Sequence, residues 1–192
     1  MILPIVAYGH PVLKKLGAEI DKKYPKLDEL IANMFETMYS AKGVGLAAPQ
    51  VGVSVRLFIV DAAPFADDED KKKTDEFLKT FKKVFINAQI IEETGKEWEF
   101  NEGCLSIPKV REDIDRKPHI RIQYYDENFN FFDEKYKGLA ARIIQHEYDH
   151  IDGILFTDRM NPLRKRLLKR KLNDISKGKV EVDYKMKFPL KK

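Results

Sequence analysis

Residues 145–150, which read QHEYDH, are the segment best equipped to do chemistry. They contain the pattern H-E-x-x-H, and on a helix turning about 100° per residue His150 lies only about 40° around from His146. Glu147 shares the same side of that helix. Two imidazoles one turn apart can bind one metal ion, and a carboxylate beside them can act as a general base. We therefore expect a catalytic divalent metal at His146 and His150, with Glu147 as the base.

The apolar residues around this motif argue against a solvated surface helix. Leu139 and Ile143 precede the histidines on the same arc, so they would give the metal an apolar floor, as in a substrate pocket. Ala140, Ile144 and Ile151 fall about 100° further round the helix, where they would contact the core. A helix buried on two sides rarely presents histidines to water, which favours the metal site.

Two histidines leave the third protein ligand to be found. The residues after His150 read IDGILFTDRM, so the downstream third histidine of metzincin peptidases is absent. A glutamate on a later helix, as in gluzincin peptidases, remains an alternative. Cys104 is the strongest candidate, because a thiolate is a strong ligand. His10 and His119 lie in isolated settings.

Two further segments carry a resemblance to a known family. Residues 43–50 read GVGLAAPQ and residues 102–106 read EGCLS. Together with QHEYDH they form three ordered blocks that resemble the bacterial-type, metal-dependent peptide deformylases, from the start of the chain to about Arg166. The resemblance implies removal of the N-formyl group from the initiator methionine of new polypeptides, with release of formate.

The resemblance also implies a role for individual residues. A metal-bound water would attack the formyl carbon, with Glu147 as the catalytic acid and base. Gln50 and the backbone N–H of Leu105 would point at the reacting carbonyl oxygen. The implied metal ligands are Cys104, His146 and His150. Ferrous iron is the usual ion of the family, and zinc or nickel can occupy the site.

The expected substrate, an N-formylmethionyl peptide, needs a backbone partner and an apolar slot. Gly43 and Gly45 allow a close approach of the backbone, so Val44 could pair with an extended peptide as an added strand. Gly103 would also contact the substrate. Alignment of the motifs predicts that the methionine slot is lined by Val44, Phe100, Leu139 and Ile143.

Two rival functions stay open on the residues alone. One is a zincin-type metallopeptidase, which would require a downstream Glu or His ligand instead of Cys104. The other is a nucleic-acid-binding protein with a structural metal. Structural zinc sites usually fill all four positions with protein ligands, whereas only three are visible here, which favours catalysis.

The periodicity of the sequence predicts the elements that must position these residues. Helices are expected over 25–41, 138–151 and 162–172, and strands over 56–60, 84–91, 120–125, 131–136 and 180–186. Lys42 and Gly43 would end the first helix, with the glycine in a C-cap role. Residues 126–130 would be the turn of a hairpin. The prediction is a single α+β domain over 1–192, with largely antiparallel sheets packed around the H-E-x-x-H helix.

Charge is distributed unevenly along the 192 residues. Residues 159–192 carry 13 Lys and Arg against 3 Asp and Glu, a balance of +10, which leaves −6 for the first 158 residues of a chain with net charge +4. Residues 66–83 are dense in charge and are expected to form a surface insertion with one short helical turn. The basic C-terminal helix and strand could face solvent or an electrostatic partner such as the ribosome.

Further features of the sequence indicate where the protein works and which partners it lacks. The apolar run at the N-terminus is too short for a signal peptide, and no stretch is long enough to span a membrane. The single cysteine, Cys104, excludes an internal disulfide and suits a reducing compartment. We expect a cytoplasmic enzyme with no membrane partner and no sequence-specific nucleic-acid binding.

Overall fold

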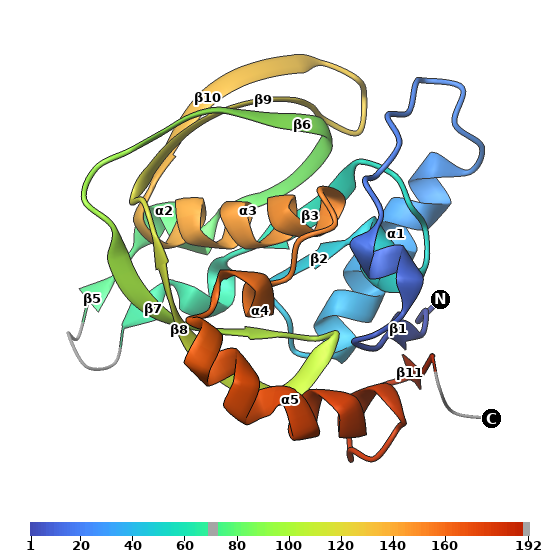
Figure 1. Cartoon of the computed structure of the whole chain (residues 1–192). Helices are drawn as coiled ribbons and strands as arrows, with labels where there is room; N and C mark the ends of the chain where they lie inside the picture. The colour runs from blue at the N-terminus through green and yellow to red at the C-terminus, as the bar shows by residue number, and fades with distance from the viewer. Residues whose placement is uncertain (69–72, 190–192) are drawn as a thin grey trace.

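A curved five-stranded sheet forms the centre of the computed structural model, in the order β10-β9-β6-β3-β2. All its neighbouring pairs are antiparallel. The sheet arches over helix α3 (Gly138–Ile151), as Figure 1 shows. The α+β class, with antiparallel strands around the H-E-x-x-H helix, is thereby confirmed. The strands are β2 (Gly45–Ala47), β3 (Leu57–Asp61), β6 (Lys82–Thr94), β9 (His119–Tyr125) and β10 (Phe131–Lys137).

The structure describes residues 1–68 and 73–189. Residues 69–72, within the predicted insertion, and 190–192, at the end of the predicted basic tail, lie outside the described residues. No helix in the described ranges combines the length and the apolar character that a membrane span requires.

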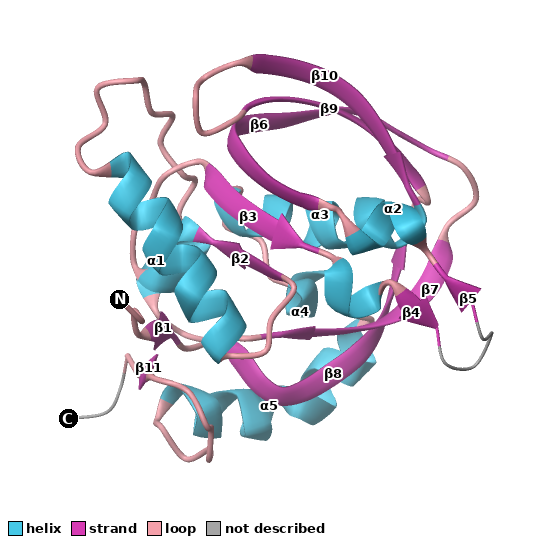
Figure 2. Ribbon diagram, turned by 180° about the vertical axis from the view of Figure 1, so that it is seen from behind, coloured by secondary structure: helices cyan, strands magenta, loops and turns pink. Residues whose placement is uncertain are grey.

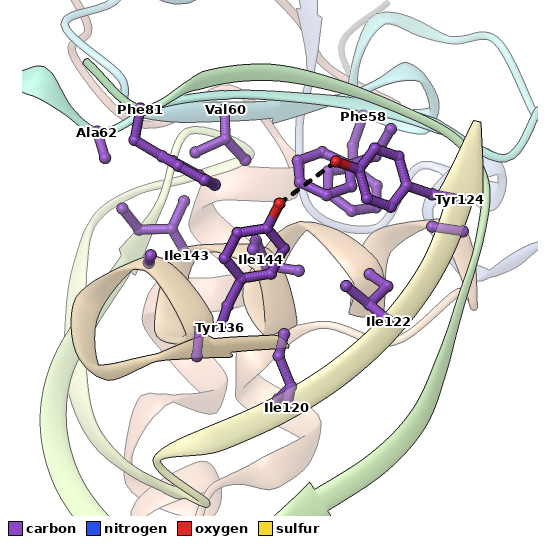
Figure 3. Close-up of a cluster of buried hydrophobic side chains, with 14 of the residues drawn as sticks. Phe58, Val60, Ala62, Phe81, Ile120, Ile122, Tyr124, Tyr136, Ile143 and Ile144 are labelled. Carbon is purple, nitrogen blue, oxygen red and sulfur yellow. Dashed lines mark hydrogen bonds between the residues drawn. The ribbon is translucent and has the colours of Figure 1, made fainter. Parts of the chain in front are cut away.

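Strand β3 shows why each face of the sheet carries a helical layer. Phe58 and Val60 belong to the hydrophobic cluster that includes α3, whereas Leu57 and Ile59 belong to the cluster that includes α1 (Leu27–Ser40). Successive side chains point to opposite faces of a strand, so an apolar run such as LFIV must be covered on both sides. Figure 3 shows the first of these clusters.

Helix α1 confirms the predicted amphipathic helix but corrects its end. Met34 and Met38 are fully buried on the predicted apolar stripe. The residue with positive φ after the helix is Lys42, at 56°, and not Gly43. The expected C-cap role of Gly43 is therefore wrong. The lysine accepts the left-handed conformation, and the glycine serves a different purpose, described below.

The sequence prediction missed a second sheet formed by β7 (Trp98–Cys104) and β8 (Ile107–Arg116). These strands pair antiparallel and lie below α3 in Figure 1. Their inner side contacts the short helix α4 (Phe156–Arg159) and α5 (Pro162–Ser176) through a third hydrophobic cluster. Helix α5 extends beyond the predicted 162–172, and its Asn161 side chain accepts a hydrogen bond from Leu163 N–H at 2.8 Å.

The predicted strand over 180–186 is largely wrong. Only β11 (Met186–Lys187) is a strand, and it pairs in parallel with β1 (Ile5–Val6). Figure 2 shows these two short strands side by side, beyond the end of α5. Residues 180–185 form no strand, and the chain bends at Val180, Asp183 and Tyr184.

The predicted charged insertion includes the predicted helical turn, α2 (Glu76–Lys79). Before it lie the 3-10 helix η3 (Ala63–Phe65) and the paired strands β4 (Asp67–Asp68) and β5 (Lys73–Thr74). Leu78 and Phe81 are buried in the cluster with α3, so the segment contributes to the core as well as to the surface. Two more 3-10 helices occur at η1 (Pro11–Lys14) and η2 (Ala48–Val51).

Candidate metal and active site

Helix α3 positions both histidines and Glu147, and its bounds are those predicted from the sequence. Ala140, Ile144 and Ile151 are almost completely buried in the core, as expected from their arc. The opposite side of the helix is held by Asp149, whose carboxylate accepts hydrogen bonds from Arg116 at 2.8 Å and from Arg159 at 2.5 and 2.6 Å. With one face packed and another paired to arginines, the helix has little freedom to rotate.

Cys104 is the last residue of β7, beside an irregularity in the pairing with β8. Gly103 pairs with Arg111 and Cys104 with Ile107, so the extra residues lie in β8 and the alternation of β7 is kept. The Cys104 Sγ lies 3.3 Å from the Nε2 of His150. One ligand atom from each of Cys104, His146 and His150 lies within 4.8 Å of the others. Three donors at this separation can surround one ion.

Glu102 fixes the orientation of the His146 ring. Its carboxylate accepts a hydrogen bond from His146 Nδ1 at 2.9 Å, which leaves Nε2 to face the metal position. The same carboxylate accepts from Arg116 at 2.7 and 2.9 Å and from Arg142 at 3.0 Å. Burial would raise the pKa of Glu102, but the hydrogen bonds from Arg116 and His146 outweigh it and hold that pKa far below its ordinary value. Glu102 is therefore a permanent anion behind the ligand.

Glu102 belongs to the EGCLS segment, but no role for it was predicted from the sequence. The available signal was its spacing, because residues 102 and 104 share one face of a strand and the ligand at 104 therefore brings 102 to the same side. Its partners Arg116 and Arg142 come from β8 and α3, so no local pattern could have identified them.

The electrostatics of the site suit a cation. Burial lowers the pKa of His146, but its hydrogen bonds to Cys104 and Glu102 raise it well above the ordinary value, so the surroundings favour positive charge there. Burial lowers the pKa of His150 and keeps that imidazole neutral, the form that ligates metals. The donor set of one sulfur and two imidazole nitrogens fits a divalent transition metal.

Glu147 differs from Glu102 in the surroundings of its carboxylate. Its Oε2 atom is buried and has no hydrogen-bond partner in the described part of the chain. Burial raises the pKa of Glu147 to about 7. A buried, unpartnered oxygen of this kind is available to exchange a proton with a reactant.

Gly45 is necessary because Glu147 lies against the backbone of β2. A Cβ at position 45 would stand 2.4 Å from the Glu147 Oε1 and 2.7 Å from its Cγ and Cδ. Gly43 plays a similar part toward Leu105, since a Cβ there would lie 2.9 Å from the Leu105 Cδ1. Both glycines therefore permit close approach by other side chains, and neither has positive φ.

Gln50 extends its amide toward the ligand residues from the 3-10 helix η2. The Oε1 atom accepts a hydrogen bond from Ala47 N–H at 2.8 Å, which sets the direction of the amide. Its Nε2 then lies 3.4 Å from both the Cys104 Sγ and the Ser106 Oγ. The side chain is 1 % exposed, so the donor is held in place inside the protein.

Comparisons with known proteins agree with this geometry. The model of the family described as polypeptide deformylase matches residues 2–166. The chain belongs to the peptide deformylase family. A peptide deformylase of Christiangramia forsetii is 65% identical over 190 residues, covering 98% of this chain and 97% of that protein. One of Flavobacterium psychrophilum is 61% identical over 193 residues, with full coverage of both.

Solved deformylase structures share the fold. A crystal structure from Legionella pneumophila has a TM-score of 0.77 at 34% identity, covering 93% of this chain and 98% of that one. One from Thermotoga maritima has a TM-score of 0.73 at 35% identity, covering 84% and 99%. The chain is thus a metallohydrolase with deformylase activity, and its Cys/His/His triad forms the metal site.

The deformylase cleft has a volume of about 510 Å³ and contains most of the predicted site residues. Leu139 does not line it, but lies in a separate hollow with Tyr136 and Gly138, because it sits a full turn closer to the start of α3. His150 lies beneath the cleft and is 1 % exposed. The predicted residues that do line it are Gly43, Val44, Gly45, Gln50, Phe100, Gly103, Cys104, Leu105, Ile143, His146 and Glu147.

Several parts of the cleft wall were absent from the sequence prediction, and two of them bear on the site. The first part is Arg142, which lines the cleft although its guanidinium is buried, bonded to Glu102 and 4.4 Å from the centre of the Trp98 ring. The second part is the segment from Glu181 to Tyr184. This segment lies beyond residue 166, where the match to the deformylase family ends.

Proposed function

We propose that the chain deformylates N-formylmethionyl polypeptides, releasing formate, with Glu147 as general base and then general acid. The observation that carries this proposal is the convergence of Cys104, His146 and His150 beside the unpartnered Oε2 of Glu147, in a member of the deformylase family. A divalent ion held by these three residues would supply a Lewis acid that lets water ionise near neutral pH.

Glu147 would accept a proton from the attacking water and deliver it to the leaving amine nitrogen. Its position inside the cleft, fixed by the close approach of Gly45, supports this role. Gln50 and the Leu105 N–H would donate to the oxygen on which negative charge develops. Loss of one such donor typically costs ~10²–10³ in rate.

The peptide would bind along the edge of β2. This strand ends the five-stranded sheet, so its outer side is available for an added strand, and Val44 immediately precedes it. Gly103 would contact the peptide from the β7 side of the cleft. The methionine slot would be formed by Val44, Phe100 and Ile143, without the predicted Leu139.

The test is formate release from formyl-Met-Ala-Ser by anaerobically purified, metal-loaded protein. We expect turnover in the native chain and none in Glu147→Gln, which should keep its metal because Glu147 is not a ligand. A folded and metal-loaded native chain that released no formate would refute the proposal. Substantial turnover by Glu147→Gln would remove that residue from the mechanism.

We propose ferrous iron as the native metal, with zinc or nickel as substitutes. The Cys/His/His donor set accepts all three ions, so family membership carries the preference. Metal analysis of anaerobically prepared protein, with activity measured on the same samples, tests it. Activity that followed zinc content and not iron content would overturn it.

We further propose that residues 1–192 act as one cytoplasmic catalytic domain whose basic tail contacts the ribosome. The tail's exposed basic residues on α5, among them Arg166, Lys169 and Arg170, support an electrostatic contact. Reversal of these three charges should abolish co-sedimentation with ribosomes at low salt. Unchanged co-sedimentation would exclude the contact.

A further inference from the structure

Residues 181–184 form one side of the catalytic cleft although they lie outside the family match. Glu181, Val182, Asp183 and Tyr184 line the same cleft as His146 and Glu147. The segment is fixed at its far end, where the Ile5 N–H donates to the Lys185 carbonyl and the Ala7 N–H to the Lys187 carbonyl, both at 2.9 Å. This part of the tail is therefore built into the active site.

Tyr184 is the residue of this segment that contacts the catalytic machinery. Its hydroxyl donates a hydrogen bond of 2.7 Å to the Leu105 carbonyl, across 79 residues of sequence. Its ring is partly buried and packs on the cluster that contains Leu46 and Met38, together with Leu105. Apolar groups therefore shield this hydrogen bond from water on one side, and a shielded hydrogen bond is stronger than one in open water.

Leu105 is held from three directions. The preceding residue is the metal ligand Cys104, and the Leu105 side chain lies close to the Gly43 backbone. Tyr184 restrains the carbonyl on the other side of the Leu105 Cα. Residues 105 and 106 form a turn between β7 and β8 and have no strand partner there, so without Tyr184 the carbonyl loses a fixed anchor.

We propose that Tyr184 is a positioning residue for deformylation: through the Leu105 carbonyl it fixes the direction of the Leu105 N–H toward the reacting oxygen. This rests on the proposed oxyanion role of Leu105. Oxyanion donors contribute only when they are aligned in advance with the developing charge. Loss of the hydroxyl should therefore reduce kcat by about tenfold, less than the ~10²–10³ of a lost donor, and should leave KM nearly unchanged.

The experiment compares the native chain, Tyr184→Phe and the control Tyr39→Phe. The control also removes one hydroxyl hydrogen bond, the 2.6 Å bond to Asp61, but outside the cleft. Formate release from formyl-Met-Ala-Ser gives kcat and KM at matched metal content. The amide signal of Leu105 in the ¹H–¹⁵N spectrum of zinc-loaded protein reports its N–H directly.

The proposal expects Tyr184→Phe to lower kcat about tenfold and to shift the Leu105 amide signal, with both unchanged in Tyr39→Phe. A kcat within twofold of native, or a lowered kcat with an unmoved Leu105 signal, would overturn it. If the native chain itself released no formate, the proposed function would fail, whereas the Leu105 signal would still show whether Tyr184 fixes that residue.

A rescue variant separates positioning from folding. Incorporation of 4-aminophenylalanine at position 184 restores an N–H donor at the place of the hydroxyl. It should recover most of the lost kcat and return the Leu105 signal toward its native position. A variant that folds and binds metal but recovers neither would contradict the assignment, even if Tyr184→Phe proved too unstable to assay.

Discussion

Replacement of Gly45 by alanine is the sharpest test of how Glu147 is positioned. The new Cβ would stand 2.4 Å from the Glu147 Oε1, whereas ordinary contact begins at 3.4 Å. The oxygen must therefore retreat by about 1 Å, and the surrounding side chains leave little room because Glu147 is only 5 % exposed. A displacement of ~1 Å can cost ~10²-fold in rate, or ~2.7 kcal/mol of transition-state stabilisation.

Steady-state formate release at matched metal content measures this effect. We expect kcat to fall about 100-fold with metal binding intact, since the atoms nearest to the added Cβ all belong to Glu147, which is not a ligand. Gly138→Ala is the matched control: its Cβ meets nothing within 4 Å, but its φ of +60° should cost about 1 kcal/mol of stability without changing kcat. A Gly45→Ala enzyme with kcat within threefold of native would refute the reasoning.

Three further substitutions test the site and the sheet. Cys104→Ala should lose most of its metal, measured by elemental analysis of purified protein; full retention would favour the zincin alternative. Glu102→Gln should weaken metal affinity about 10–100-fold in a chelator competition, because the His146 Nδ1–H loses its charged acceptor; an affinity within twofold would contradict this. Burial raises the pKa of Glu134, but hydrogen bonds from Tyr124 and Tyr136 outweigh it and hold that pKa below its ordinary 4.5. The carboxylate therefore stabilises the fold above that pH and less as pH falls. Glu134→Gln should therefore flatten the acid-side decline of unfolding free energy, whereas parallel curves would exclude this contribution.

The local periodicity of the sequence was sufficient to predict helix α3 but not strand β8. In α3 the metal motif and the apolar stripe occupy fixed arcs of one helix, so the sequence alone determines which residues converge. In β8 the inward positions alternate with exposed ones, but they include Glu112 and Arg116 beside Val110 and Ile114. Buried charges break the apolar alternation that identifies a strand, and they are tolerated only because partners arrive from distant elements.

The C-terminal segment shows the opposite case. The alternation over 180–186 is real, since Val182, Tyr184 and Met186 are partly buried while Glu181, Asp183 and Lys185 are exposed. It arises because alternate side chains of this segment pack on the protein, although residues 180–185 form no strand. Sequence pattern reports burial of alternate side chains, and it cannot report whether the backbone has a hydrogen-bonded neighbour.

The distance in sequence between Tyr184 and the rest of the cleft sets an order of events during synthesis. All three metal ligands and Glu147 are translated by residue 150, and so is every other cleft residue apart from residues 181–184. A growing chain therefore contains all of its metal ligands while one side of the cleft is still unmade. The hydrogen bond between Tyr184 and Leu105, which are 79 residues apart in sequence, must form later. The residues that hold the metal are therefore all present before the residues that complete the cleft around it.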